Sequence, residues 1–380
     1  MFSTNKIRPI NFRKFFDIKM KSNIRIVHII DKISEKNISI LQVINNLKKY
    51  SDKKFNFKTK IITSIIQKKF FFKKNDMIII NENKFIFDYS ALYNKIKNTD
   101  IVHIHGMWSY FNILSIFITL YFNKKLIIHP HGMLLEEAIN NSIFFKRILK
   151  KIILFFLKYL LNKNCLFVAI TKKEQVSINY FFINKIIIIP NTIEIKKLNK
   201  KIKLNNHFVF FGRINKIKNL DLLIKSFLQS KLDKTYKLFL YLIDDDQELK
   251  LKLKKLVGQS KYIIFKKPVF GKLKDEILQK SWVNVLLSKS EVNSYSVLEA
   301  SSLEVPSVVT KNISIKNFQK NGGVVTNKEI EDIVKKFKSV SSWKLADRLK
   351  MGKKIRRFIL RLYSQKKIYK KYDFLYNDIS

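Results

Sequence analysis

Short apolar segments alternate with segments of helical periodicity along most of the chain. Residues 23–30 (NIRIVHII) predict a buried strand, and residues 38–50 carry apolar side chains at helical spacing after it. Further apolar segments, each ending in polar residues or glycine, stand before Pro190 at 101–105, 126–129, 166–170 and 186–189. This alternation is typical of a parallel sheet with helices on both faces.

A second series of the same kind follows a polar, lysine-rich stretch at 195–206, which we interpret as a linker. Its apolar segments are 207–211, 237–243, 262–265, 283–287 and 307–310. The sequence therefore predicts an α/β protein with two Rossmann-like, doubly wound domains, and a length of 380 residues suits two cores. We place the domains at 23–194 and 207–355, after a basic N-terminal extension at 1–22.

The balance of charged residues is strongly basic, with 75 Lys and Arg against 29 Asp and Glu and a formal net charge of +46. Such a charge suits a nucleic-acid-binding protein or one that binds an anionic membrane surface. Only nine of the basic residues are arginine, the side chain that makes bidentate contacts with bases and phosphates. We therefore expect no specific nucleic-acid partner, although nucleic-acid binding remains an alternative.

Residues 144–161 (FFKRILKKIILFFLKYLL) are both basic and strongly apolar. One interpretation is a helix packed on the core with solvated lysines, and the other is a helix that lies in an anionic membrane interface. The longest apolar runs, 110–122 and 152–161, are too short or interrupted to span a bilayer, and residues 1–22 lack the apolar region of a signal peptide. We expect a cytoplasmic protein, with peripheral contact at the inner face of the plasma membrane left open.

Two histidine-rich tetrapeptides stand at the carboxyl ends of predicted strands, where open α/β sheets bind ligands. They are HIHG at 103–106 and HPHG at 129–132. An H-x-H pair places both imidazoles on one face of a strand, but no carboxylates stand nearby, so we expect no metal site. His131, between a proline and a glycine, is the best candidate for a side chain exposed in a cleft.

The segment 208–227 predicts a strand that leads through a short loop into a helix. Gly212 and Arg213 end the strand, and Lys218 precedes the helix. A glycine lets the backbone approach a phosphate, and two cations at a helix N-terminus neutralise a diphosphate. The arrangement favours a leaving group that gains negative charge during the reaction.

The segment 290–310 contains Glu291 and Glu299 in an E-x7-E spacing. Carboxylates accept hydrogen bonds from vicinal hydroxyls, so one can hold a ribose and the other a sugar. Backbone N–H groups around Asn293, Ser294 and Ser296 can face phosphates. A glycosidase that uses both glutamates is disfavoured, because nothing in the segment indicates that they flank one bond.

In their order and spacing, these motifs resemble the retaining glycosyltransferases of family 4, which have the GT-B fold, in which two Rossmann-like domains face each other across a cleft. The resemblance covers nearly the whole chain. It includes AITKKEQ at 169–175, IPNTIE at 189–194, FGRINKIKNLDLLI at 211–224, Pro306 after the E-x7-E segment, and the tail ADRLKMGKKIRRFI at 346–359. It implies C-terminal helices at 356–380 that return to the first domain.

The resemblance also implies roles for individual residues. Arg213 and Lys218 match the pair that binds the donor diphosphate, and Glu299 matches the carboxylate that holds the ribose. Glu291 matches the group near the transferred sugar, and His131 the histidine that faces the donor sugar and the reacting centre.

A donor that is a nucleotide-diphosphate sugar is implied, with a glycan or lipid-linked acceptor in surface polysaccharide or lipopolysaccharide biosynthesis. Neither a metal nor another cofactor is expected, because the two cations take over the metal's role. Recognition of the acceptor should fall to the first domain, where His105, Gly106 and Gly132 are candidates.

The chain departs from the family pattern at three positions. The loop after the first strand, DKISEKNIS at 31–39, contains no glycine. Val-Asn-Ser follows Glu291 where the family has glycine, and Glu304 replaces a glycine before Val-Pro. A catalytically degenerate relative of the family is therefore an alternative.

Overall fold

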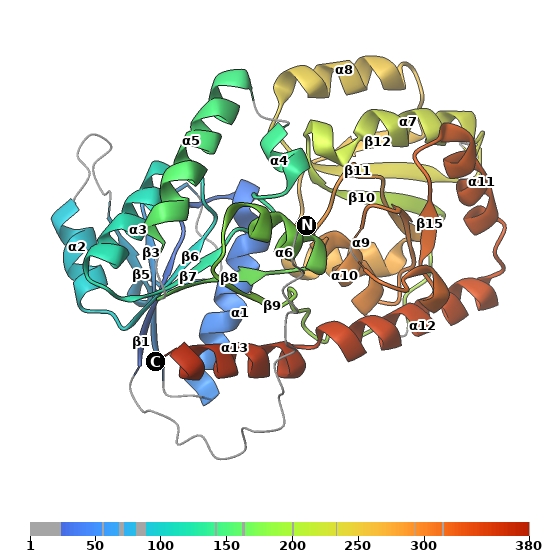
Figure 1. Ribbon diagram of the computed structural model, residues 1–380. Helices are drawn as coiled ribbons and strands as arrows, with labels where there is room; N and C mark the ends of the chain where they lie inside the picture. Colours follow the sequence, from blue (N-terminus) through green and yellow to red (C-terminus); the bar gives the residue numbers. More distant parts are fainter. Residues whose placement is uncertain are drawn as a thin grey trace, which may run out of the picture.

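The computed structural model describes residues 24–54, 57–67, 72–80, 89–140, 143–161, 164–199, 201–232, 234–292, 294–313 and 315–379. The predicted N-terminal extension, 1–22, lies outside the described residues. The described chain forms two α/β lobes that lie beside each other (Figure 1).

The first domain is built on a seven-stranded sheet in the order β5-β3-β1-β6-β7-β8-β9, with every pair parallel. Its strands are β1 (Arg25–Ile29), β3 (Lys58–Thr63), β5 (Met77–Ile79), β6 (Ile101–His105), β7 (Lys125–His129), β8 (Cys165–Ala169) and β9 (Lys185–Ile188). A short pair, β2 (Lys32–Ile33) and β4 (Ile65–Ile66), lies apart from this sheet. The apolar side chains of β6, β7 and β8 are buried on both faces, which explains their continuous apolar sequences.

Helices cover both faces of the first sheet. One core cluster holds side chains from α2 (Tyr89–Lys97), α3 (Tyr110–Tyr121), α5 (Phe144–Leu160) and α6 (Lys172–Phe181). The cluster on the opposite face holds side chains from α1 (Ile38–Lys54) and α13 (Gln365–Ile379). A short helix, α4 (Glu136–Asn140), follows the loop after β7.

The second domain has a six-stranded parallel sheet in the order β12-β11-β10-β13-β14-β15. Its strands are β10 (His207–Arg213), β11 (Lys237–Ile243), β12 (Ile263–Lys266), β13 (Val283–Leu286), β14 (Ser307–Thr310) and β15 (Val324–Thr326). Its helices are α7 (Leu220–Gln229), α8 (Gln247–Val257), α9 (Gly271–Lys280), α10 (Tyr295–Ser302), α11 (Ile330–Ser341) and α12 (Leu345–Tyr363). Successive β10 side chains point to opposite faces, Phe208 and Phe210 into one cluster and Val209 and Phe211 into the other, so this sheet is also covered on both sides.

The chain returns to the first domain at Ser364. Helix α12 packs on the second domain, and the N–H of Ile193 then donates to the carbonyl of Tyr363 at 2.9 Å. Helix α13 packs against β-strand side chains and α1 of the first domain. The predicted GT-B class is therefore confirmed, including the returning helix, although the predicted boundary at 356 falls inside α12. Within the described residues, no helix is long and apolar enough to cross a bilayer.

Candidate functional site

A cavity of about 980 Å³ lies between the two domains. The first domain contributes the loop after β1, the start of α1 and the loop after β7, and the second contributes the end of β10, the loop after β13, and α9 and α10. The cavity therefore stands at the carboxyl ends of parallel strands from both sheets, the usual position of ligand sites in this architecture.

Most of the residues singled out in the sequence line this cavity. They are His131, Gly132, Gly212, Arg213, Lys218, Glu291, Ser294, Ser296 and Glu299. His105 and Gly106 are buried behind the cavity wall and do not line it. Asn293 lies outside the described residues.

Lys218 and Glu291 form an ion pair on the second-domain side of the cavity. Lys218 ends the 3-10 turn η4 (Lys216–Lys218), and the side chain of Asn215 accepts a hydrogen bond from its backbone N–H at 3.1 Å. The Nζ of Lys218 contacts the carboxylate of Glu291, and both side chains are less than one-fifth exposed. The pair thus holds one cation and one anion at the point where the sequence predicts a diphosphate and a sugar.

Glu299 lies in the first turns of α10 and is almost completely buried. Its carboxylate accepts hydrogen bonds from Nζ of Lys274 at 2.5 Å and from Nε2 of Gln42 at 3.3 Å. Burial by itself raises the pKa of Glu299, but the charges of Lys274 and Lys196 outweigh it, so the pKa lies below the usual glutamate value. Glu299 is therefore an ionised acceptor at neutral pH.

Sequence reasoning did not single out Lys274. It lies on α9, and nothing in the segment GKLKDE distinguishes it from the many lysines on solvated faces. Its role as the partner of Glu299 appears only when α9 packs beside α10.

A three-residue charge bridge joins the two domains. The carboxylate of Asp245 pairs with Lys36 of the first domain at 2.7 Å and with Arg213 of the second at 3.6 Å. Lys36 belongs to the glycine-free loop after β1, which here forms the 3-10 turn η2 (Glu35–Asn37). The loop therefore presents a lysine to the other domain at the place where the family pattern has glycine.

A buried carboxylate accepts a hydrogen bond from the backbone of the loop that carries His131. Glu174, near the start of α6, accepts hydrogen bonds from the backbone N–H of Gly132 and from that of Ile170, the latter at 2.7 Å. Burial is the largest influence on this group, and it raises the pKa of Glu174 to about 7 despite both hydrogen bonds. His131 and Gly132 both have positive φ, at 54° and 82°, so the loop is a tight left-handed turn.

Gly132 also marks a close approach between the domains. A Cβ added at Gly132 would lie 2.4 Å from Cγ2 of Val292, which is closer than real contacts allow. Val292 stands directly after Glu291 at one of the positions where the family pattern has glycine. The valine side chain therefore occupies space that the glycine of the first domain leaves open.

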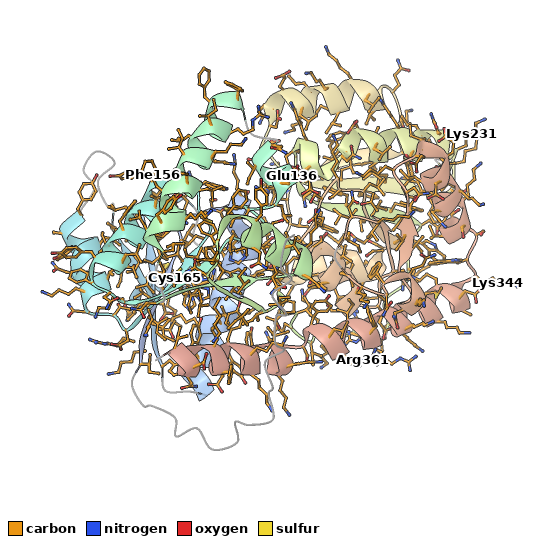
Figure 2. All side chains as sticks on the ribbon, viewed as in Figure 1. Glu136, Phe156, Cys165, Lys231, Lys344 and Arg361 are labelled. Carbon is orange, nitrogen blue, oxygen red and sulfur yellow. The ribbon has the colours of Figure 1, made fainter. Side chains whose placement is uncertain are left out.

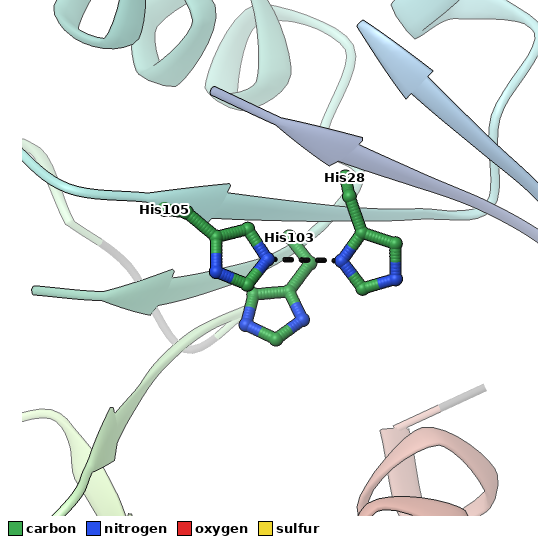
Figure 3. Close-up of side chains that lie close together, drawn as sticks. All are labelled: His28, His103 and His105. Atoms are coloured by element: carbon green, nitrogen blue, oxygen red, sulfur yellow. Dashed lines mark hydrogen bonds between the residues drawn. The ribbon is translucent and has the colours of Figure 1, made fainter. Parts of the chain in front are cut away.

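Five histidines form a row along the ends of β1, β6 and β7. His131 Nε2 lies 2.9 Å from His105 Nδ1. His105 Nε2 lies 2.9 Å from His28 Nδ1, and Figure 3 shows this second contact. Burial lowers the pKa of all three rings, to about 3 for His28 and His131, so they are neutral. His103 donates to or accepts from the hydroxyl of Tyr376 on α13 at 2.9 Å.

The hydrogen-bonded histidines constrain one another's tautomers. The Nε2 of His28 is buried without a hydrogen-bond partner among the described residues. A buried N–H without an acceptor is rarer than a bare acceptor, so the proton of His28 is favoured on Nδ1. His105 and His131 then also carry their protons on Nδ1, which makes the ring of His131 a hydrogen-bond donor at the cavity wall.

Two histidine trios in the described part of the chain have ring nitrogens within 4.8 Å of one another and could hold a metal ion. They are His28, His103 and His105, and His105, His129 and His131. A metal in either trio would break a histidine–histidine hydrogen bond, and the first trio is no more than 1% exposed. The expectation of a metal-free site stays a prediction.

Part of the chain matches a known protein family. Residues 191–358 match the family model described as glycosyl transferases group 1. A search of the curated proteins finds no match. The match to the family model covers the second domain and most of α12.

Solved structures resemble the whole chain. HepE from Anabaena, crystallised in complex with UDP and glucose, is 13% identical, with a TM-score of 0.75 and coverage of 93% of this chain and 100% of its own. Sucrose-phosphate synthase from Thermosynechococcus elongatus is 12% identical, with a TM-score of 0.70 and coverage of 94% and 99%. WaaG, a glycosyltransferase involved in lipopolysaccharide biosynthesis, is 12% identical, with a TM-score of 0.69 and coverage of 92% and 99%. The chain thus has the fold of the GT-B glycosyltransferases, and its residues 191–358 carry the match to glycosyl transferases group 1.

Proposed function

We propose that the protein is a glycosyltransferase that moves a sugar from a nucleotide-diphosphate sugar to an acceptor. The observation that carries this proposal is the convergence of Arg213, Lys218, Glu291 and Glu299 on one interdomain cavity, opposite His131. The first four lie inside the segment that matches the family model. A volume of about 980 Å³ is large enough for a nucleotide sugar and the end of an acceptor.

Each charged group has a role in this proposal. Arg213 and Lys218 bind the diphosphate, with Lys218 exchanging its bond to Glu291 for one to a phosphate oxygen. The N-terminus of α10, at Ser294 and Ser296, opens onto the same cavity and favours negative charge. Glu299, kept ionised by Lys274, accepts hydrogen bonds from the ribose hydroxyls.

The reaction proposed is the retaining transfer of family 4. The bond between the anomeric carbon and the phosphate oxygen breaks, a bond to the acceptor oxygen forms on the same face, and the acceptor proton passes to the leaving phosphate. Arg213 and Lys218 stabilise the charge that this phosphate gains, which makes a metal or other cofactor unnecessary. His131, a neutral donor, orients the transferred sugar together with Glu291.

The proposed acceptor is a glycan or a lipid-linked glycan of surface polysaccharide or lipopolysaccharide biosynthesis. Support comes from WaaG, whose structure this chain resembles and which takes part in lipopolysaccharide biosynthesis. The acceptor would meet the first domain, at the loop of Lys36 and the turn of Gly132.

A catalytically degenerate protein that binds the donor without turnover is the second candidate. It is favoured by Lys36 in the glycine-free loop and by Val292 against Gly132, because both place a side chain at the contact between the two domains beside the cavity. Donor hydrolysis or transfer by the purified protein would separate the two candidates.

The proposal is tested by thermal unfolding in the presence of nucleoside diphosphates and their sugars. A ligand that binds only the native state raises Tm, by the equivalent of about 2.7 kcal/mol at one hundred times Kd. We expect the correct donor to raise Tm of the wild type and of Lys216→Ala, an exposed neighbour outside the cavity wall. Arg213→Ala and Glu299→Ala should abolish the shift, and a full shift in both would refute the donor site.

A further inference from the structure

Helix α5 presents an apolar face to solvent. Phe145 is 78% exposed, Phe156 58% and Tyr159 71%, and further apolar side chains of the helix are exposed beside them. Only Leu154 and Leu157 within α5 are buried. The helix lies on the outer side of the first domain, where Phe156 is labelled in Figure 2.

The exposed residues lie on one continuous face. At about 100° per residue, Phe144, Ile148, Ile152, Phe155 and Phe156 fall within an arc of about 120°, opposite the two buried leucines. A core-facing helix buries its apolar stripe and exposes its polar one. Helix α5 packs Leu154 and Leu157 in the core, as the first interpretation expects, but it exposes most of its other apolar side chains to solvent.

The charges on α5 are all of one sign. Arg147, Lys151 and Lys158 form one flank of the apolar face, and the helix contains no Asp or Glu. The guanidinium of Arg147 lies 5.6 Å from the ring centre of Phe144, so cation and apolar surface adjoin directly. Long basic side chains beside an apolar face are typical of helices in an anionic interface.

The neighbouring helix and the loop after it also expose apolar side chains. Helix α6 contacts α5 and exposes Tyr180 at its last turn. Ile183, just after α6, is 94% exposed. Tyrosine is well suited to the boundary between headgroups and acyl chains, because it has an apolar ring and a polar tip.

We propose that the outer face of α5 docks on an anionic lipid bilayer, with the aromatic side chains among the upper acyl chains and the basic flank at the headgroups. A second copy of the chain fits this face poorly, since symmetric pairing would bring the two basic flanks together without an acidic partner. Lipid phosphates supply the missing negative charge.

The docked helix would stand beside the cavity. Helix α4, which contacts α5, lines the cavity with Glu137 and Ala138. If the proposed glycosyltransferase activity holds, docking favours a lipid-linked acceptor as the substrate, because its sugar end could enter the cavity from the membrane. Docking itself does not depend on that activity.

The test is flotation of the full-length protein with vesicles of phosphatidylcholine alone or of equal parts phosphatidylcholine and phosphatidylglycerol. We expect the wild type to float with the anionic vesicles, and the double variant Phe145→Ser, Phe156→Ser to lose about tenfold or more in partition coefficient. Leu251→Ser, on α8 of the second domain and 60% exposed, is the matched control and should float as the wild type does. Arg147→Gln with Lys151→Gln should reduce the preference for anionic over neutral vesicles and weaken the dependence on salt.

Wild type that stays unbound, or a double variant that floats as well as the wild type, would overturn the inference. A dimer in solution that the double variant dissociates, without vesicle binding, would assign the face to a second copy instead. Equal thermal midpoints of wild type and double variant show that the variant is folded. These readouts need no donor, so failure of docking is distinct from failure of the proposed transfer.

Discussion

At the scale of single residues, the site depends on buried ion pairs, in which each charge keeps its partner ionised. Glu299 stays ionised because Lys274 lies 2.5 Å away, whereas burial alone would favour its neutral form. Breaking a buried ion pair leaves an uncompensated charge, which destabilises more than the pair stabilises. Lys274 should therefore matter for both stability and donor binding.

We predict that Lys274→Met lowers the free energy of unfolding by about 1–3 kcal/mol at pH 7 and abolishes the donor-induced rise in Tm. The pKa of Glu299 is lowered in the folded wild type, so the pair stabilises above the unfolded pKa and is lost as pH falls through the folded one. In the variant Glu299 protonates more readily, so the Tm difference should shrink between pH 7 and pH 4. Lys280→Met, at an exposed lysine of the same helix that does not line the cavity, should behave as wild type.

Glu174 provides a pH dependence of the opposite sign. Its pKa is raised to about 7 in the folded protein, so the folded state binds the proton more tightly and stability falls as pH rises from about 4.5 to 7. We predict that Glu174→Gln flattens this slope in thermal unfolding between pH 5 and 7. Glu137→Gln, at a partly exposed carboxylate that contacts Lys173, should retain the wild-type slope.

At the scale of elements, α13 ties the end of the chain to the first domain. Ile368, Tyr369 and Leu375 are buried against that domain, and Tyr376 bonds His103. The helix therefore completes one face of a sheet whose last strand, β9, ends at Ile188, far earlier in the chain. The first domain depends on it for part of its core.

We predict that Leu375→Ala lowers the free energy of unfolding by about 2–5 kcal/mol, because a fully buried leucine leaves a cavity. Leu349→Ala, on α12 and 37% exposed, should cost much less. Denaturant unfolding followed by circular dichroism measures both, and equal losses would show that α13 does not stabilise the first domain in this way.

At the scale of the whole molecule, two of the contacts between the domains bear on the shape of the cavity. One is the bridge from Lys36 through Asp245 to Arg213, and the other is the packing of Val292 over Gly132. The second contact leaves no space for a Cβ on the first-domain turn. The width of the cavity at His131 thus depends on a valine of the other domain.

A double-mutant cycle tests this coupling. Gly132→Ala destabilises the folded protein in two ways, through a clash with Val292 and through a side chain on a residue with φ of +82°. Val292→Gly relieves only the clash. We predict that Gly132→Ala destabilises by about 2–4 kcal/mol and that Val292→Gly restores part of that loss in thermal unfolding. Strictly additive effects would show that the two loops do not press on each other.

Much of the fold could be predicted because buried parallel strands have continuous apolar sequences. Segments 101–105, 237–243 and 307–310 coincide with β6, β11 and β14. In the two large sheets, the strands that the pattern missed are β3, β5 and β15, which are short or, in β3 (KTKIIT), carry exposed lysines between buried residues. Such segments gain their strand conformation from pairing with a neighbour, and a local pattern does not record pairing.

The sequence by itself determined which side chains stand at strand ends, because strand periodicity and strand termini are local properties. Gly212, Arg213 and Glu291 could therefore be named in advance as residues of one edge. Only the tertiary structure decided the partners, with Lys274 beside Glu299 and with Lys36 and Arg213 on the same carboxylate of Asp245. It also decided that the apolar face of α5 turns outward. Those choices depend on packing between elements far apart in the chain, and the same lysines and phenylalanines would look alike in sequence whichever way they faced.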